Sequence, residues 1–229
     1  ILIINKPRGL LVQKDKTGVK ALDDMVLSYL VYKGEYKVGD SYTPGPAHRL
    51  DRNTAGLVIF GKNTKVLQYL FTLIKEKTLI SKHYITLVKG EIDKDGFIDA
   101  PLKKNEKSSL VFVTPIEEGG KPSRTNYHVI TKMNGYTLLD VVLESGRTHQ
   151  IRVHMSYIHH PVVGDNKYGD FELNHMIEKE YGFKNQFLVA NRIDFGELSA
   201  PLNNLNKKHI EVDMPLECKT LLDKLIDTK

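Results

Sequence analysis

The stretch YHVITKMNGYTLLDVVL, residues 127–143, carries the clearest local signal for the fold. It contains two runs rich in β-branched and aromatic residues, which favour strands. Between the runs lies Asn134-Gly135, the pair favoured in the type I′ turn of a two-residue hairpin. The stretch therefore predicts an antiparallel hairpin with strands over Tyr127–Met133 and Tyr136–Leu143.

The residues on either side of this hairpin predict further short strands and a few helices. After the hairpin, Thr148 is a candidate N-cap, and the helix that it begins is expected to end at His159-His160-Pro161. Because strands outnumber helices and hairpin-like connections outnumber βαβ units, we expect an α+β fold with a mixed, mainly antiparallel central sheet and flanking helices and loops. The other expected elements are strands at 1–4 (resumed at 10–12), 57–61 and 83–89, a loop at 41–47, short strands and loops within 91–124, and helices at 19–32, 65–77 and 215–226.

The composition is typical of a globular protein without membrane spans. Of 229 residues, 41% are hydrophobic and 27% are charged. No apolar run approaches the ~20 residues that a membrane helix needs. The chain begins ILII, without Met or a secretory leader, so we expect a piece of a longer protein. Its one cysteine, Cys218, excludes an internal disulfide and a cysteine-rich zinc site and favours a cytoplasmic location.

The charge permits a nucleic acid as a partner but does not require one. Lys and Arg total 33 against 28 Asp and Glu, which gives a net charge of +5, and the pI is about 9.0. A basic excess of this size is a weak indication of a polyanionic partner. The chain lacks a P-loop, a GxGxxG motif after a strand, an HExxH motif and a GxSxG motif, which argues against the enzyme classes that use them.

The segment HRLDR, residues 48–52, places one carboxylate between two arginines on a loop that enters a buried strand. Asp51 could be an ordinary turn residue that bonds to its own backbone. Alternatively, Arg49 and Arg52 could stabilise its ionised form, which would suit a nucleophile or a base at neutral pH. The local pattern leaves both interpretations open.

The segment KHYITLVKG, residues 82–90, alternates like a strand and carries Tyr84. A tyrosine at such a position is usually part of a half-buried sheet. It could instead stack on a nucleic-acid base and present its hydroxyl as a polar group.

The segment ESGRTHQIRVH, residues 144–154, follows the predicted hairpin. Gly146 and Arg147 lie where the second strand turns into the helix, so a guanidinium and backbone N–H groups could bind an anion there. A solvated basic patch is the alternative.

Three other features have structural interpretations. We interpret PVVGDNKYG at 161–169 as a structural loop and His159-His160 as helix-end residues rather than metal ligands. Cys218 is interpreted as a core residue.

Together these segments resemble the RluA-type family of RNA pseudouridine synthases, and the resemblance covers nearly the whole chain. The sequence departs from the family where Ala55 replaces a frequent Ser and where Val189 replaces a frequent His, and both changes concern packing more than activity. The similar segments are INKPRGLLVQ at 4–13, HRLDRNTAGLVIFGK at 48–62, KHYITLVKG at 82–90, GKPSRTNYHVI at 120–130, ESGRTHQIRVHMSYIHHPVVGDNKYG at 144–169 and FLVANRIDF at 187–195.

The resemblance implies that residues 1–229 form one pseudouridine synthase catalytic domain with an active-site cleft across the sheet. It implies a cytoplasmic monomer that isomerises uridines in structured RNA, without a cofactor or a metal. The family's usual upstream S4-type RNA-binding domain is absent from this chain. The segment DFELNHM, residues 170–176, is similar to the branch that modifies large-subunit ribosomal RNA, and transfer RNA is the alternative substrate.

By the same resemblance, Asp51 is the catalytic aspartate and Tyr84 stacks on the uracil ring. Arg147 pairs with the catalytic carboxylate, and Arg49 helps to occupy the gap that the extruded base leaves. Attack by Asp51 at C1′ of the ribose and attack at C6 of the ring remain alternatives. The candidate RNA-binding residues are Arg8, His48, Arg49, Arg52, Arg152 and Lys167.

Two other classes of protein are possible. An RNA-binding module without catalysis could have lost Asp51 or Tyr84, but both residues are present. A metal-dependent nuclease needs several carboxylates around its ions, and the HRLDR loop offers only one. The sequence therefore favours a pseudouridine synthase.

Overall fold

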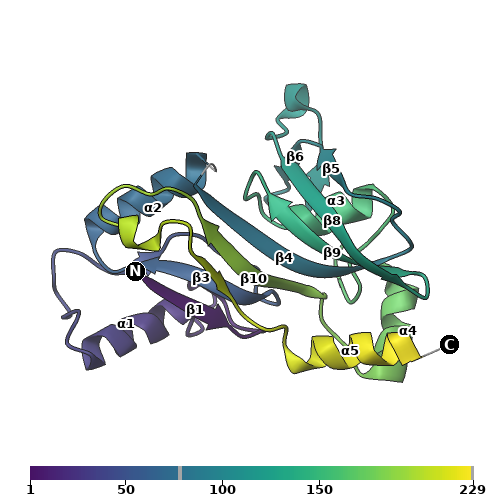
Figure 1. Ribbon diagram of the computed structural model, residues 1–229, viewed down its shortest axis with the longest axis horizontal. Helices are drawn as coiled ribbons and strands as arrows, with labels where there is room; N and C mark the ends of the chain where they lie inside the picture. Colours follow the sequence, from purple (N-terminus) through teal and green to yellow (C-terminus); the bar gives the residue numbers. More distant parts are fainter. Residues whose placement is uncertain (77–78, 228–229) are drawn as a thin grey trace. The chain divides into compact units, whose positions relative to one another are not determined.

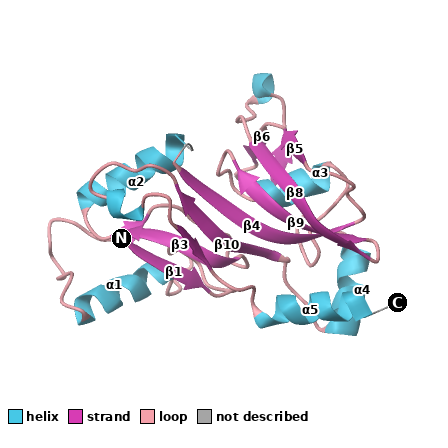
Figure 2. Ribbon diagram, in the orientation of Figure 1, coloured by secondary structure: helices cyan, strands magenta, loops and turns pink. Residues whose placement is uncertain are grey.

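The computed structural model describes residues 1–76 and 79–227 and divides the chain into two compact units (Figures 1 and 2). The boundary between the units falls within strand β4 (Ile80–Lys89) and within strand β10 (Leu188–Phe195). The expectation that residues 1–229 form one catalytic domain stays a prediction. The first unit comprises Ile1–Ser81 and Arg192–Val212, and the second comprises Lys82–Asn191 and Asp213–Lys229.

The first unit is built around strand β3 (Ala55–Gly61), whose seven residues are all buried. Strand β1 (Leu2–Lys6) pairs with it in antiparallel orientation, and β3 lies between β1 and β10 in the sheet. Helix α2 (Thr64–Glu76) places its apolar face in the same hydrophobic cluster as Leu57 and Ile59. The unit also contains α1 (Leu22–Tyr32), β2 (Gly45–Pro46), a 3₁₀ turn (Asn203–Leu205) and β11 (His209–Glu211).

The second unit contains a sheet in which β4 pairs with β9 (Tyr136–Leu143), β9 with β8 (Arg124–Met133) and β8 with β5 (Gly96–Asp99). All three pairings are antiparallel. A second, two-stranded sheet joins β6 (Leu102–Lys104) to β7 (Val111–Val113). The remaining elements are a 3₁₀ turn (Ile116–Glu118), α3 (Gln150–Tyr157), α4 (Phe171–Tyr181) and α5 (Leu216–Asp227).

These elements confirm the prediction of an α+β fold with a mainly antiparallel sheet. The predicted hairpin is formed by β8 and β9. Its turn residues Asn134 and Gly135 have φ angles of 46° and 81°, and a type I′ turn requires positive φ at both positions. Within the described residues, no helix is long and apolar enough to cross a membrane.

Several other expected elements are also present. The strands expected at 1–4, 57–61 and 83–89 correspond to β1, β3 and β4. The helices expected at 65–77 and 215–226 correspond to α2 and α5, although residue 77 lies outside the described residues. Cys218 is buried in the core, as are the two positions that depart from the family pattern, Ala55 and Val189.

The expectation of a strand at 10–12 is wrong. The carbonyl groups of Leu11 and Val12 accept hydrogen bonds from Leu22 N and Asp23 N, at 2.8 and 3.0 Å. These two carbonyls therefore bind the N–H groups at the start of α1, which would otherwise lack partners within the helix. The same contacts explain why α1 begins at Leu22 rather than at residue 19.

The prediction for the start of α3 is also wrong. The residue at the N-cap is His149, with a φ of 54°, rather than Thr148. The sequence patterns did not predict α4, β10, β11 or the 3₁₀ turn at Asn203–Leu205, and the short strand β2 lies within the loop expected at 41–47. The signals for α4 were present in the sequence, since Asp170 at its N-cap accepts a hydrogen bond from Leu173 N and Gly182 ends it in a left-handed conformation.

Candidate functional site

In the first unit, Asp51 lies on a loop that leads directly into β3. A main-chain hydrogen bond from Thr54 N to Asp51 O, 3.1 Å long, closes a turn at the end of this loop. Thr54 is buried, Asp51 is partly exposed and Arg52 is exposed. The loop therefore presents a carboxylate near the surface immediately before a strand that is fully buried.

Lys6 connects the Asp51 loop to the segment that follows β1. Its side chain is completely buried, and its Nζ donates to the carbonyl oxygens of Pro7, Leu10 and Arg52 at 2.9, 2.8 and 3.1 Å. Burial lowers the pKa of Lys6 to about 8, while the negative charge of Asp51 opposes this shift. The three carbonyl oxygens can only accept, so they match the three N–H groups of the charged ammonium.

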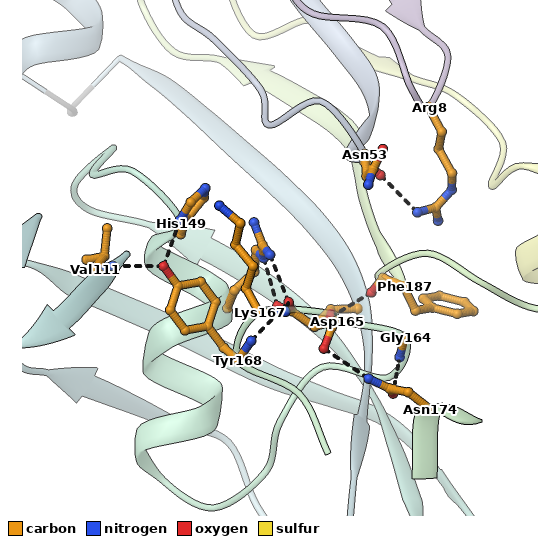
Figure 3. A network of polar contacts seen from close by, with 12 residues as sticks. Arg8, Asn53, Val111, His149, Gly164, Asp165, Lys167, Tyr168, Asn174 and Phe187 are labelled. Carbon is orange, nitrogen blue, oxygen red and sulfur yellow. Dashed lines mark hydrogen bonds and ion pairs between the residues drawn. The ribbon is translucent and has the colours of Figure 1, made fainter. Parts of the chain in front are cut away.

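Two arginines make further connections between the same segments. Arg8 Nη1 donates to Asn53 O at 3.0 Å (Figure 3), and Arg52 Nε donates to Gly9 O at 3.0 Å. The segment from Lys6 to Gly9 and the Asp51 loop are thus joined by several hydrogen bonds from cationic side chains. Of the other predicted residues, Arg49 is exposed, and His48 accepts a hydrogen bond at Nε2 from Ile59 N, 3.2 Å away.

In the second unit, Tyr84 lies on β4 opposite Val141 of β9. Its side chain is only 5% exposed, so it is more deeply buried than the half-buried position that the alternating pattern suggested. Lys82 precedes it by two residues and therefore lies on the same face of the strand. Burial lowers the pKa of Lys82 to about 8, a property that the alternating sequence pattern did not predict.

Arg147 lies on the turn between β9 and α3. Its side chain is exposed, and its Nε donates to Pro122 O at 3.4 Å. Its main-chain N–H donates to the side-chain oxygen of Gln150 at 3.0 Å. The turn thus combines an exposed guanidinium with a main chain that is bound to a buried side chain, because Gln150 is 2% exposed.

A chain of buried polar groups continues from Gln150 to His154. Gln150 Nε2 donates to Thr125 Oγ1 at 2.9 Å, and Thr125 Oγ1 lies 2.8 Å from His154 Nδ1. His154 Nε2 lies 2.9 Å from the carbonyl oxygen of Ala100, which can only accept. The imidazole is therefore protonated at Nε2 and accepts from Thr125 at Nδ1.

Arg152 is placed differently from the expectation of an RNA contact. Arg152 is 5% exposed. Its guanidinium donates two hydrogen bonds to Asp165, from Nε to Oδ2 and from Nη2 to Oδ1, both 2.7 Å long. Asp165 is fully buried. This pair belongs to the protein interior, so Arg152 does not offer its guanidinium to a phosphate at the surface.

The loop at 161–169 is organised by the same aspartate (Figure 3). Asp165 Oδ1 accepts from the main-chain N of Lys167 and Tyr168, at 2.8 and 3.2 Å, and Asn174 Nδ2 donates to Asp165 O. Tyr168 Oη accepts from Val111 N and lies 2.8 Å from His149 Nδ1. These contacts support the structural role expected for this loop, and they leave Lys167 exposed.

We expect His154 to make stability depend on pH. Burial lowers the pKa of His154 below its ordinary value of 6.5, so the unfolded chain takes up this proton more readily than the folded chain. The contribution of His154 to the free energy of unfolding is therefore fully present above about pH 6.5. Below that pH the free energy of unfolding declines by up to about 1.4 kcal/mol per pH unit. Urea unfolding at pH 7.5 and 5.5 measures the decline. His154→Gln should reduce it and the exposed control His175→Gln should not; equal declines in both variants would contradict the prediction.

Within the described residues, no three His, Cys, Asp or Glu side chains are grouped so as to hold a metal. Of the two histidines after α3, His160 binds the main chain through its ring. His160 Nδ1 lies 2.8 Å from Lys89 O, and His160 N and His159 N donate to carbonyls of the helix.

Comparison with known proteins gives matches over most of the chain. A family described as RNA pseudouridylate synthase matches residues 1–157. Ribosomal large subunit pseudouridine synthase D of Buchnera aphidicola subsp. Acyrthosiphon pisum is 35% identical over 235 aligned residues, which cover 98% of this chain and 70% of that protein. Ribosomal large subunit pseudouridine synthase C of Vibrio cholerae is 37% identical over 171 residues, which cover 74% of this chain and 51% of that protein.

A solved structure has the same fold. Human RNA Pseudouridylate Synthase Domain Containing 4 matches with a TM-score of 0.76 and 18% sequence identity, over 97% of this chain and 88% of that one. At this identity the likeness concerns the fold alone. The chain spans about half the length of several curated relatives, among them the Vibrio cholerae protein at 51%.

Proposed function

The chain belongs to the RNA pseudouridylate synthase family, and from this we propose that it converts specific uridines in structured RNA to pseudouridine. The observation that carries the proposal is the loop of Asp51. Lys6, Arg8 and Arg52 all donate hydrogen bonds that connect this loop to the segment after β1, while Asp51 itself stays partly exposed. A carboxylate held on a fixed loop among cations suits a nucleophile at neutral pH.

The proposed substrate is large-subunit ribosomal RNA. This assignment is supported by the names of the relatives, which are ribosomal large subunit pseudouridine synthases. Transfer RNA is the alternative that the test must distinguish. We propose that the two units act together as one catalytic domain, in a monomer, and that the reaction takes place in the cytoplasm.

The proposed reaction requires the uridine to leave its stack. Extrusion of the base costs a few kcal/mol, and stacking on an aromatic side chain returns about 1–3 kcal/mol. Tyr84 is the proposed aromatic partner and Arg49 the proposed occupant of the gap. Asp51 attacks either C1′ of the ribose or C6 of the ring, and the detached uracil rejoins C1′ through C5. The bond to Asp51 then breaks, C5 loses its proton and N1 gains one, so the carboxylate is regenerated. The bond from N1 to C1′ is exchanged for one from C5, so the isomerisation needs no added oxidant or reductant.

Arg147 is the proposed partner of the Asp51 carboxylate during the reaction. Removing a carboxylate from water raises its energy, and a fixed guanidinium opposes that cost. The exposed basic residues in the matched segments, Arg49, Arg52 and Lys167, are proposed to bind phosphates together with Arg8. Arg152 is not included, because its guanidinium is bound to Asp165.

Pseudouridine mapping tests the proposed function directly. Total RNA from cells with and without the gene is mapped at single-nucleotide resolution, and the deleted strain is complemented with the wild type or with Asp51→Asn. We expect sites in large-subunit ribosomal RNA to disappear on deletion and to return only with the wild type. Sites lost from transfer RNA instead would overturn the assigned substrate. Complementation by Asp51→Asn would favour an RNA-binding protein without catalysis.

Lys167 should contribute to RNA affinity through a phosphate contact. Each such contact makes log affinity fall by about 0.7–0.9 per tenfold increase in salt. Lys167→Ala should therefore weaken binding to RNAs of different sequence and flatten this dependence by about one contact. Titration of a labelled ribosomal RNA fragment at several salt concentrations measures both effects. Lys94→Ala, an exposed lysine outside the matched segments, is the control. Binding that does not depend on salt would contradict the proposal.

A further inference from the structure

We infer that Gln150 is a positioning residue that fixes the Arg147 turn and thereby the direction of its guanidinium. The inference rests on the proposed function, in which Arg147 partners the reacting carboxylate. It concerns a residue that touches neither the substrate nor the reacting atoms. Its action is on the main chain of the turn, through hydrogen bonds made inside the second unit.

Every hydrogen-bonding group of the Gln150 carboxamide has a partner. Oε1 accepts from Arg147 N at 3.0 Å and from Ser145 Oγ at 2.7 Å. Nε2 donates to Arg124 O at 2.9 Å and to Thr125 Oγ1 at 2.9 Å. An amide side chain has two N–H donors and two acceptor sites on its oxygen, so Gln150 is saturated.

The orientation of this amide is determined by its neighbours. The main-chain N–H of Arg147 can only donate, and the carbonyl oxygen of Arg124 can only accept. An inverted amide would place donor against donor and acceptor against acceptor at these two contacts. Since Gln150 is 2% exposed, water could not relieve such a mismatch easily. The buried site therefore selects one orientation, and that orientation binds the Arg147 turn.

The same network secures the groups that Gln150 binds. Arg124 N donates to Ser145 Oγ at 3.0 Å, so the Ser145 hydroxyl is held at both its donor and its acceptor side. Thr125 Oγ1 accepts from Gln150 and donates to His154 Nδ1. Gln150 thus connects the start of β8 and the turn after β9, which carries Arg147, to the start of α3.

Among the described residues, the Arg147 side chain makes one hydrogen bond, to Pro122 O. It is exposed, and its contact with Pro122 O is long, at 3.4 Å. If the Cα of a flexible side chain is fixed, the side chain samples fewer orientations. It then loses less conformational entropy when it binds an anion. Gln150 supplies this rigidity through the main-chain N–H of Arg147.

A double-mutant cycle between Gln150 and Arg147 tests the inference. Gln150→Met keeps the length of the side chain but removes all four hydrogen bonds. We expect it to lower the single-turnover rate by at least about tenfold, while RNA affinity changes by less than about threefold. In an Arg147→Ala background the same substitution should have little effect, because there is no guanidinium left to position. Hydrogen exchange at the Arg147 amide should become faster in Gln150→Met.

Two further variants separate positioning from simple loss of stability. Val153→Ala lies on the same helix and is buried, so it should destabilise α3 without changing the Arg147 amide or the rate. Ser145→Ala removes one of the two hydrogen bonds to Gln150 Oε1 and should produce a smaller loss of the same kind, which preserves the test if Gln150→Met does not fold. Equal losses with and without Arg147 would overturn the inference and leave the proposed function intact. A wild type that isomerises no uridine would reject both.

Discussion

Replacing Asp51 by Asn should lower the rate of uridine isomerisation by more than about a thousandfold, equivalent to about 4 kcal/mol of activation free energy. The amide has nearly the same size as the carboxylate but is neutral and a poor nucleophile. The turn that Asp51 closes uses its main-chain oxygen, which the variant keeps. The fold and the RNA affinity should therefore change little. Single-turnover assays with excess enzyme, together with RNA titration, measure the two effects separately.

A control variant removes the same charge from another part of the chain. Asp93 has an 85% exposed side chain and is ion-paired with Lys132, so Asp93→Asn should leave the rate unchanged. If Asp51→Asn retained more than about a thousandth of the wild-type rate, Asp51 would not be the catalytic group.

The second large effect is expected at Tyr84. Tyr84→Phe keeps the aromatic face and removes only the hydroxyl. If the hydroxyl takes part in proton transfer after the glycosidic bond breaks, the rate should fall by about 10²–10⁴-fold, since this is the usual contribution of a positioned acid or base. RNA binding should be preserved. The pseudouridine yield and the RNA affinity of the variant test both statements.

Tyr84→Leu is the comparison that separates stacking from proton transfer. It removes the ring as well as the hydroxyl, so it should lose the stacking of the base in addition. Because Tyr84 is 5% exposed, the smaller leucine also leaves a cavity in the core. The thermal stability of the variant protein must therefore be measured as well. Equal, near-normal rates for the Phe and Leu variants would rule out both roles.

The fold elements that the sequence predicted correctly depend on residues close together in the chain. Asn134 and Gly135 accept positive φ, which is enough to make the hairpin turn. The apolar run of β3 and the helical spacing of α2 likewise carry their own signal. The prediction of a strand at 10–12 was wrong because the carbonyls of Leu11 and Val12 bind the N–H groups at the start of α1. This contact joins residues about ten positions apart, so the local pattern does not reveal it.

The sequence by itself determined the family, because the similar segments occur in a specific order along the chain. The roles proposed for Asp51, Tyr84 and Arg147 follow from their places in those segments. It could not determine which polar side chains are buried. Arg147 and Arg152 are five positions apart in one segment, yet one is exposed and the other is bound to Asp165 in the interior.

Only the tertiary structure decided that Lys6 and Gln150 are buried, and which groups they bind. Lys6 is buried because Arg52, 46 positions away, supplies one of its three carbonyl partners. Gln150 is saturated because Arg124 and Thr125, 26 and 25 positions away, accept its two N–H groups. A polar side chain can be buried only where its hydrogen bonds are satisfied. Those partners come from distant parts of the chain, so local patterns cannot reveal them.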